Sequence, residues 1–334
     1  MTHVSKGREP IRFPTESVKE KQCTGYVLTA ENASNASKHP LVIYVHGLGG
    51  NAAAEATRQF TDYFRVHAIT SLALNLPGHG EPAFMSAGSK ESALRLDANV
   101  ACVKKAIEYA ASRQDILLEK IYLYGTGSGG PIALATAVQD ERIKAVATRS
   151  CLLDVLNNTA VHKMIHGMFD PRGTKHLSNP HFTADIIHDM LPPAADGEFS
   201  YITQCAKQLK ERHLPVMYCF STYDQYIPLE HQLRLAQDLC IPTAYLEAMI
   251  EVMQNHSRNQ SDDDILRREE LLMNKGVSLA NGIMDLNPYH DTIIWREYFG
   301  ADNPMDNKIS KKRNYFENVI KNVTAFFIKQ IENI

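Results

Sequence analysis

The residues of this chain that could do chemistry lie in a glycine-rich turn at residues 125–130, which reads Gly-Thr-Gly-Ser-Gly-Gly. The turn follows an apolar run, residues 121–124, and precedes a run of helical character, residues 131–137. A serine hydroxyl presented on such a strand–turn–helix acts as a nucleophile when a neighbouring base removes its proton. Ser128 is therefore the candidate nucleophile.

The turn fits a nucleophile site in two registers, and the sequence leaves both open. Small residues must flank the nucleophile on either side because its backbone is strained and the strand and helix approach closely. If Gly125 and Gly129 are these flanks, the central residue is Gly127, which has no hydroxyl. One residue further along the chain, the centre is Ser128. The choice between the two decides whether the turn carries a nucleophile.

A nucleophilic serine also needs a histidine base and a carboxylate that orients the histidine. Asp224 follows the apolar run 215–220 and is the candidate carboxylate. Two histidines beyond it are candidate bases. His256 follows a run that could be the last strand, whereas His290 lies nearer the final helix. If the run before His256 is helical instead, His290 is favoured.

Alternating apolar runs and helical patterns must position these residues. We expect strands at 25–29, 41–45, 70–75, 121–124, 143–148, 215–220 and 243–249. We expect helices around Phe60 and Phe64 and at 92–112, 131–137, 229–239 and 315–331. Strands that alternate with helices indicate right-handed crossovers and a mostly parallel, doubly wound sheet.

Two further motifs lie at the ends of predicted strands. The first is the run His-Gly-Leu-Gly-Gly at residues 46–50, and the second is Leu-Pro-Gly-His-Gly at residues 76–80. In their order along the chain, these two motifs, the glycine turn and the Asp224 segment resemble the α/β-hydrolase superfamily. The resemblance covers roughly residues 22–250 and the final helix. Asn75 stands where that family's second motif has an acidic residue.

The resemblance implies an α/β-hydrolase fold and a role for each matching residue. The backbone N–H groups of Leu48 and Gly129 would form the oxyanion hole, which stabilises the charge of a tetrahedral intermediate. Ser128 would attack the acyl carbon, Asp224 would be the triad carboxylate, and His256 or His290 would be the base.

The expected organisation is a core with one inserted cap. Residues 1–20 are polar and are expected to form a flexible N-terminal segment. The α/β-hydrolase core would comprise residues 21–153 and 214–334, with an irregular insertion at about 255–307. Residues 154–213 interrupt the strand–helix alternation over too long a stretch for a loop, which indicates a helical cap.

The expected function is that of a serine hydrolase, of the carboxylesterase or thioesterase kind, acting on a small-molecule acyl substrate through an acyl-enzyme. The alternative, motivated by Gly127, is a non-catalytic hydrolase-fold protein that binds a ligand or partner under the cap. No cofactor or metal is implied. Substrate identity, hydrolysis versus acyl transfer, and oligomeric state are not predicted.

Two other motifs suggest different chemistry. The turn also matches the dinucleotide-binding pattern G-x-G-x-x-G, with Arg149 as a candidate partner for a phosphate, but this would leave the other motifs unexplained. His162 and His166 have the i, i+4 spacing of a zinc site, but the glutamate of H-E-x-x-H is absent from this run. We therefore expect these histidines to line or decorate the cap.

Composition limits the partners. The formal net charge of −3 does not favour nucleic acid or an anionic membrane. No apolar run approaches the length of a membrane span. The six cysteines include no C-x-x-C pair, so we expect reduced core thiols and a cytoplasmic protein.

Overall fold

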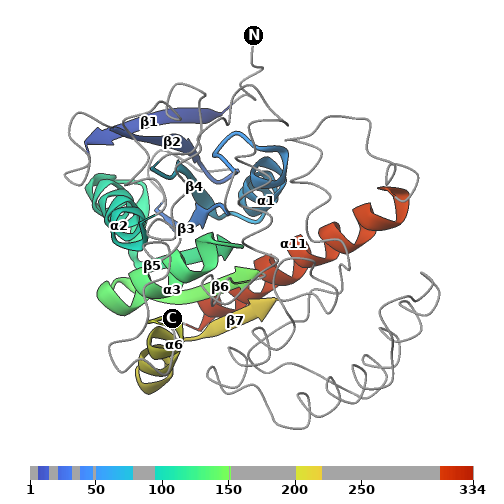
Figure 1. Ribbon diagram of the computed structural model, residues 1–334. Coiled ribbons are helices and arrows are strands. Elements are labelled where there is room, and N and C mark those ends of the chain that lie inside the picture. Colours follow the sequence, from blue (N-terminus) through green and yellow to red (C-terminus); the bar gives the residue numbers. More distant parts are fainter. Residues whose placement is uncertain are drawn as a thin grey trace, which may run out of the picture.

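The computed structural model describes residues 7–14, 22–31, 38–47, 50–77, 95–149, 151, 201–219 and 309–333. These residues build one seven-stranded sheet in the order β1-β2-β4-β3-β5-β6-β7 (Figure 1). Its strands are β1 (Arg8–Pro14), β2 (Gln22–Leu28), β3 (His39–Val45), β4 (Thr70–Asn75), β5 (Ile116–Thr126), β6 (Ile143–Arg149) and β7 (Val216–Cys219). The strands from β4 to β7 in this order run parallel, whereas β2 is antiparallel to both β1 and β4. The mostly parallel sheet expected from the sequence is confirmed.

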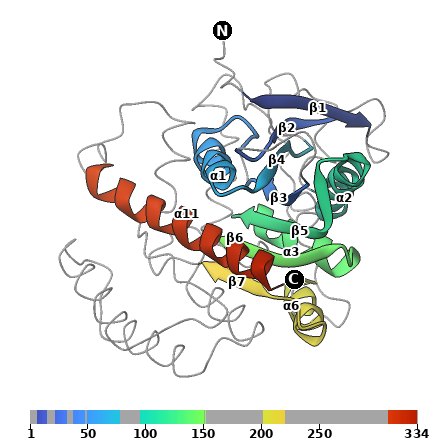
Figure 2. The same ribbon diagram turned by 180° about the vertical axis from the view of Figure 1, so that it is seen from behind.

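Helices cover both faces of this sheet. They are α1 (Glu55–Val66), α2 (Leu96–Ser112), α3 (Gly129–Gln139), α6 (Tyr201–Glu211) and α11 (Ile309–Glu332). Helices α2, α3 and α6 pack on one face, and α1 and α11 pack on the other, where α11 lies across the sheet (Figure 2). The sheet is therefore doubly wound, as predicted.

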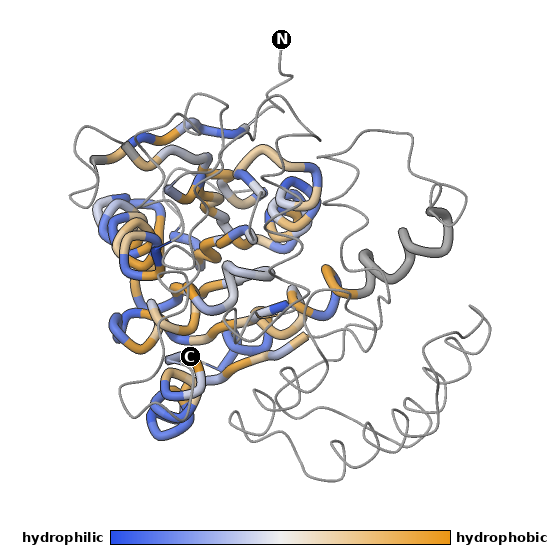
Figure 3. Tube along the Cα trace, in the orientation of Figure 1, coloured by the Kyte–Doolittle hydropathy of each residue, from blue (hydrophilic) through white to orange (hydrophobic). Residues whose placement is uncertain are grey.

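Alternation along the central strands divides the core into two layers. Ile43 of β3 and Leu123 of β5 face α2 and α3, whereas Tyr44 and Tyr124 face α1 and α11. All four are buried, which explains why these strands read as continuous apolar runs instead of alternating ones. The hydropathy colouring shows mostly apolar residues along the central strands, whereas the helices mix polar and apolar residues (Figure 3).

The prediction of a flexible segment over residues 1–20 is wrong for strand β1. Ile11 and Phe13 alternate toward the core and are buried, and Phe13 packs on Tyr109 of α2. The guanidinium of Arg8 donates a hydrogen bond of 2.9 Å to the carboxylate of Asp62 in α1. Two inward side chains in a short segment containing prolines are too few to reveal a strand by periodicity.

The C-terminal part of the predicted cap belongs to the core. Residues 201–211 form α6, whose buried side chains Ile202, Cys205, Ala206 and Leu209 join the layer of α2 and α3. The core thus includes residues 201–211, which the prediction placed in the cap, because α6 is the helix that leads into β7. The rest of the predicted cap, the helix at 229–239, the strand at 243–249 and the insertion at 255–307 lie outside the described residues.

The cysteines also differ from expectation. Cys23 of β2 and Cys102 of α2 form a disulfide, so the expectation of reduced core thiols is wrong for this pair. Cys151, Cys205 and Cys219 are buried thiols that form no disulfide. The spacing of 79 residues between the bonded cysteines carries no sequence signal, because only the fold brings β2 against α2. Of the helices in the described ranges, none has the length and apolar composition needed to cross a membrane.

Candidate active site

Two loops meet at the carboxyl ends of the central strands. Strand β3 lies between β4 and β5, so the chain moves to one side of β3 through α1 and later to its other side through α2 (Figure 1). Such a change of direction leaves a crevice outside the carboxyl ends of the parallel strands, where open α/β sheets bind their ligands. The loop after β3 and the glycine turn after β5 flank this point. They touch: a Cβ at Gly47 would lie 2.9 Å from the carbonyl oxygen of Thr126.

The backbone of the glycine turn distinguishes Gly127 from Ser128. Gly127 has a φ of +54°, in the left-handed region that side chains rarely adopt. Ser128 is helical, with φ −67° and ψ −16°, and is the N-cap of α3. The amide of Gly127 donates a hydrogen bond of 2.8 Å to the carbonyl of Arg149, and its own carbonyl accepts one of 3.1 Å from Gly130. The sharp bend of the turn is thus at Gly127.

The neighbouring glycines show where the strand and helix approach closely. A Cβ at Gly125 would overlap the carbonyl oxygen of Gly129, and one at Gly129 would overlap the carbonyl oxygen of Val45. Among the described residues, a Cβ at Gly127 would meet only the Cα of Gly47, at 3.7 Å. The two positions where a Cβ would overlap a backbone carbonyl oxygen therefore lie two residues before and two residues after Gly127. The central position has room for a side chain but holds none.

Ser128 lies beside this centre. It is half-buried, and its side chain makes no capping hydrogen bond to the first turn of α3. Gly129 is the first residue of α3 and is fully enclosed. The first turn of α3 contains no acidic side chain, so the helix itself carries no negative charge to offset the partial positive charge at this end. The turn thus offers backbone donors to an electron-rich group.

His46 fastens the loop after β3 to the end of β4. Its ring is buried, its Nε2 accepts a hydrogen bond of 3.1 Å from the amide of Leu76, and its Nδ1 lies 2.8 Å from the carbonyl oxygen of Gly47. An Nε2 that accepts has no proton, so the proton is on Nδ1, which donates to Gly47. The sequence motif indicated only a role for the backbone that follows His46. The role of the ring was missed.

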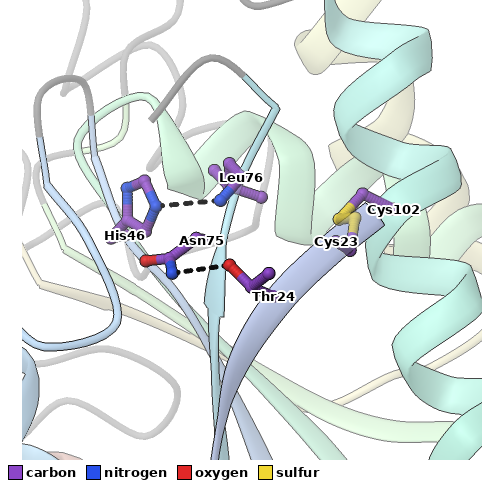
Figure 4. Close-up of a disulfide and its surroundings, with 6 residues drawn as sticks. All are labelled: Cys23, Thr24, His46, Asn75, Leu76 and Cys102. Carbon is purple, nitrogen blue, oxygen red and sulfur yellow. Dashed lines mark hydrogen bonds between the residues drawn. A yellow bond between two sulfur atoms is a disulfide. The ribbon is translucent and has the colours of Figure 1, made fainter. Parts of the chain in front are cut away.

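Asn75 connects the same loop to β2. Its Oδ1 accepts a hydrogen bond of 2.8 Å from the amide of Ala52, and its Nδ2 donates one of 2.9 Å to Oγ1 of Thr24 (Figure 4). An amide side chain can do both because it carries an acceptor and a donor. The departure from the family's acidic residue, noted in the sequence, was the available signal for this bridge.

Buried thiols lie beneath the turn. A Cβ at Gly130 would lie 2.8 Å from Sγ of Cys151, so this thiol packs directly against the start of α3. Burial raises the pKa of Cys151 well above its ordinary value, and the neighbouring Cys205 adds to the effect. The thiol therefore stays protonated and packs as an apolar group. Within the described part of the chain, no three histidine, cysteine, aspartate or glutamate side chains are grouped so that they could hold a metal ion.

The remaining predicted site residues are not placed. Leu48, Asp224, His256 and His290 all lie outside the described residues. The structure therefore brings together the glycine turn, the loop after His46 and the end of β4. The roles assigned to the triad and to the oxyanion hole remain predictions.

Comparison with known proteins gives one sequence relative and several structural ones. The quorum-quenching protein AidA of Acinetobacter baumannii (strain MDR-ZJ06) is 28% identical over 156 residues, which are 46% of this chain and 47% of that protein. The match thus spans about half the length of the relative. No protein-family model matches the chain.

The structural neighbours are more distant in sequence. The structure of DcsB in complex with its substrate analogue has a TM-score of 0.51 and is 13% identical, covering 69% of this chain and 85% of that one. The α/β hydrolase GrgF from Penicillium sp. sh18 has a TM-score of 0.46 and is 18% identical, covering 69% of this chain and 86% of that one. The strand order, with β2 antiparallel between β1 and β4, and the glycine turn at the end of β5 are those of the α/β-hydrolase fold, as the motifs predicted. The likeness to DcsB, over most of both chains, agrees with this fold.

Proposed function

We propose that this α/β-hydrolase-fold protein binds a small acyl compound at the carboxyl ends of β3 and β5 and forms no acyl-enzyme at its turn. The observation that supports this proposal is the left-handed backbone of Gly127, between two positions that must be glycine. A nucleophile in this fold needs that strained central position, where its side chain points out of the turn. Here the centre has no hydroxyl.

The turn retains features suited to binding. Backbone N–H groups at the start of α3 can donate hydrogen bonds to a carbonyl or carboxylate oxygen. The space next to the Cα of Gly127 can hold that oxygen. The acyl carbon would then lie next to the position that a nucleophile would occupy, but no covalent bond would form. Such a protein sequesters its ligand instead of cleaving it.

The relative AidA is named as quorum-quenching, which makes diffusible bacterial signals the first ligands to test. An acyl lactone and its ring-opened acid form a suitable pair, because they share the acyl chain and differ in charge. Titration calorimetry would measure binding of each, and mass spectrometry would follow the lactone during incubation. We expect the lactone to bind and to be recovered intact.

A second candidate is hydrolysis with Ser128 as nucleophile. Its hydroxyl is half-buried beside the bend and does not cap α3, so a base could still activate it. Asp224 and His256 or His290 would supply the rest of the triad. In this mechanism Ser128 attacks the acyl carbon, and water then releases the acid from the acyl-enzyme.

One experiment separates the two candidates. The wild type, Gly127→Ser and Ser128→Ala would each be treated with a fluorophosphonate and mapped by peptide mass spectrometry. We expect an unlabelled wild type, and an adduct on residue 127 in Gly127→Ser if a base remains within reach. An adduct on Ser128 of the wild type, absent from Ser128→Ala, would refute the binding proposal and establish the serine hydrolase. Failure of every acyl lactone and acid to bind would also count against the binding proposal.

A further inference from the structure

The disulfide between Cys23 and Cys102 lies close to the candidate site. It joins β2 to α2, with 6.5 Å between the two Cα atoms, and both residues are buried in the layer of α2 and α3. Figure 4 shows Cys102 projecting from the helix toward Cys23 on the neighbouring strand. A covalent bond at this place fixes the position of β2 relative to α2.

A short hydrogen-bonded path leads from this disulfide to the site. Thr24 follows Cys23 and is paired with Asn75 across the antiparallel strands β2 and β4. The Asn75 side chain accepts from the amide of Ala52 and donates to the hydroxyl of Thr24, at 2.8 Å and 2.9 Å. Ala52 belongs to the His46 loop, which we define as residues 46, 47 and 50–54 in the described chain.

The other contacts of the His46 loop depend on the same strand end. The ring of His46 accepts from the amide of Leu76, the residue directly after Asn75 (Figure 4). Within the loop, the amide of Gly50 donates to the carbonyl of Gly47 at 3.0 Å. A shift of β2 that moves Thr24 therefore changes the bridge that holds the loop beside the glycine turn.

We propose that the Cys23–Cys102 disulfide is a redox-sensitive clamp on the His46 loop, acting through Thr24 and Asn75. When the bond is present, β2 is fixed and Asn75 holds the amide of Ala52. When the bond is reduced, β2 moves more freely against α2 and the bridge opens more often. The clamp does not depend on the proposed function; only its effect on ligand binding does.

The chemistry is thiol–disulfide exchange with a dithiol. One thiolate of the dithiol attacks a sulfur of the Cys23–Cys102 bond, forming a mixed disulfide and releasing the other cysteine. The second thiol of the reductant then displaces the protein sulfur and closes its own disulfide. Two electrons and two protons pass to Cys23 and Cys102, which become thiols. Because both sulfurs are buried, the attack requires a local opening of β2 from α2.

The test compares hydrogen exchange in the oxidised and reduced protein. Peptide mapping without reductant would first identify the Cys23–Cys102 cross-link, and dithiothreitol would then remove it. We expect the amides of the His46 loop to exchange about three- to tenfold faster after reduction, the factor that corresponds to loss of one ordinary hydrogen bond. Amides of α6 should show no change, because no hydrogen bond of the path involves that helix.

Three variants make the test specific. Thr24→Val keeps the disulfide but removes the hydroxyl, so its His46 loop should exchange fast in both redox states. Cys102→Ala should behave like the reduced wild type. Cys205→Ala, at another buried cysteine, should keep the redox response.

Two outcomes would overturn the clamp. One is a protein that shows no Cys23–Cys102 cross-link under oxidising conditions. The other is a His46 loop whose exchange is the same with and without the bond. If loop exchange responds but acyl-ligand binding is absent in both states, the clamp stands and the proposed function fails.

Discussion

Glycines in the turn at the end of β5 are required for two different physical reasons. At Gly125 and Gly129 the backbone conformation is ordinary, but the carbonyl oxygens of neighbouring segments occupy the place of a Cβ. At Gly127 the space is open, but the φ of +54° is costly for any residue with a side chain. The close approach of neighbouring backbone segments therefore occurs at Gly125 and Gly129, and the backbone strain occurs at Gly127.

This difference predicts unequal costs for equal substitutions. Gly127→Ala should lower the free energy of unfolding by about 1–2 kcal/mol, the cost of a left-handed alanine. Gly125→Ala should cost about 3 kcal/mol or more, or prevent folding, because a Cβ would overlap the backbone of Gly129. Urea unfolding of the two variants measures both values. Equal destabilisation would contradict the assignment of the bend to Gly127.

The sequence could predict this turn but not its register. Gly127 and Ser128 both fit the motif, because glycine occurs at several of its positions. Only the φ of Gly127 and the close approaches at its flanks separate the two. Likewise, the ring of His46 bonds to Leu76 across two strands, and such a contact has no signature in either segment.

Among the elements, those with long apolar patterns were predicted well. Strand β4 begins and ends at the residues expected, Thr70 and Asn75, because its apolar run leads into the Pro-Gly sequence at residues 77–78, which indicates a turn. Strand β1 was missed because it buries only two large apolar side chains along its length. Helix α6 was placed in the cap because irregular sequence precedes it, although its own pattern is that of a packed helix.

Helix α11 shows how much one packed side chain contributes. Phe327 is fully buried and its ring packs on those of Tyr122 and Phe64. Phe327→Ala should lower the free energy of unfolding by about 3–5 kcal/mol, because it leaves a cavity between α11 and the sheet. The neighbouring Phe326 is half-buried, so Phe326→Ala serves as the control and should cost less. Denaturant titration compares them, and a larger loss at Phe326 would contradict the packing described.

For the molecule as a whole, both layers of the core contain groups that resist ionisation. Burial raises the pKa of Cys205, on the α6 side, to about 12. Burial also raises the pKa of Tyr122, on the α11 side, to about 12. Their ordinary values are 9.0 and 10.0, so each group stays neutral in the fold at a pH where the unfolded chain loses the proton.

The consequence is a loss of stability in alkaline solution. A pKa that is raised in the folded state contributes stability fully below the unfolded pKa and loses it as the pH rises. We therefore expect the free energy of unfolding to show no pH dependence from these groups below pH 9.0. Between pH 9.0 and about 12, the free energy of unfolding should fall as the pH rises. The slope should approach about 1.4 kcal/mol per pH unit for each group.

Urea unfolding at a series of pH values between neutral and alkaline measures this slope. Cys205→Ala should make it shallower, whatever the variant does to stability at neutral pH. An unchanged slope in Cys205→Ala would show that the Cys205 thiol does not drive the alkaline loss.

Strand β1 has a consequence for encounters between copies of this chain. Backbone N–H groups of alternate residues in a strand point to the same side, and proline has none. Pro10 and Pro14 share a row with Arg8 and Arg12. Because a proline is tolerated where it would not donate to the neighbouring strand, we expect this row to point away from β2. In this row of four residues, the two prolines have no N–H to donate to a strand of another molecule, and Arg12 is exposed and positively charged. The β1 edge is therefore a poor template for pairing with a strand of another molecule, which protects this edge of the sheet from aggregation.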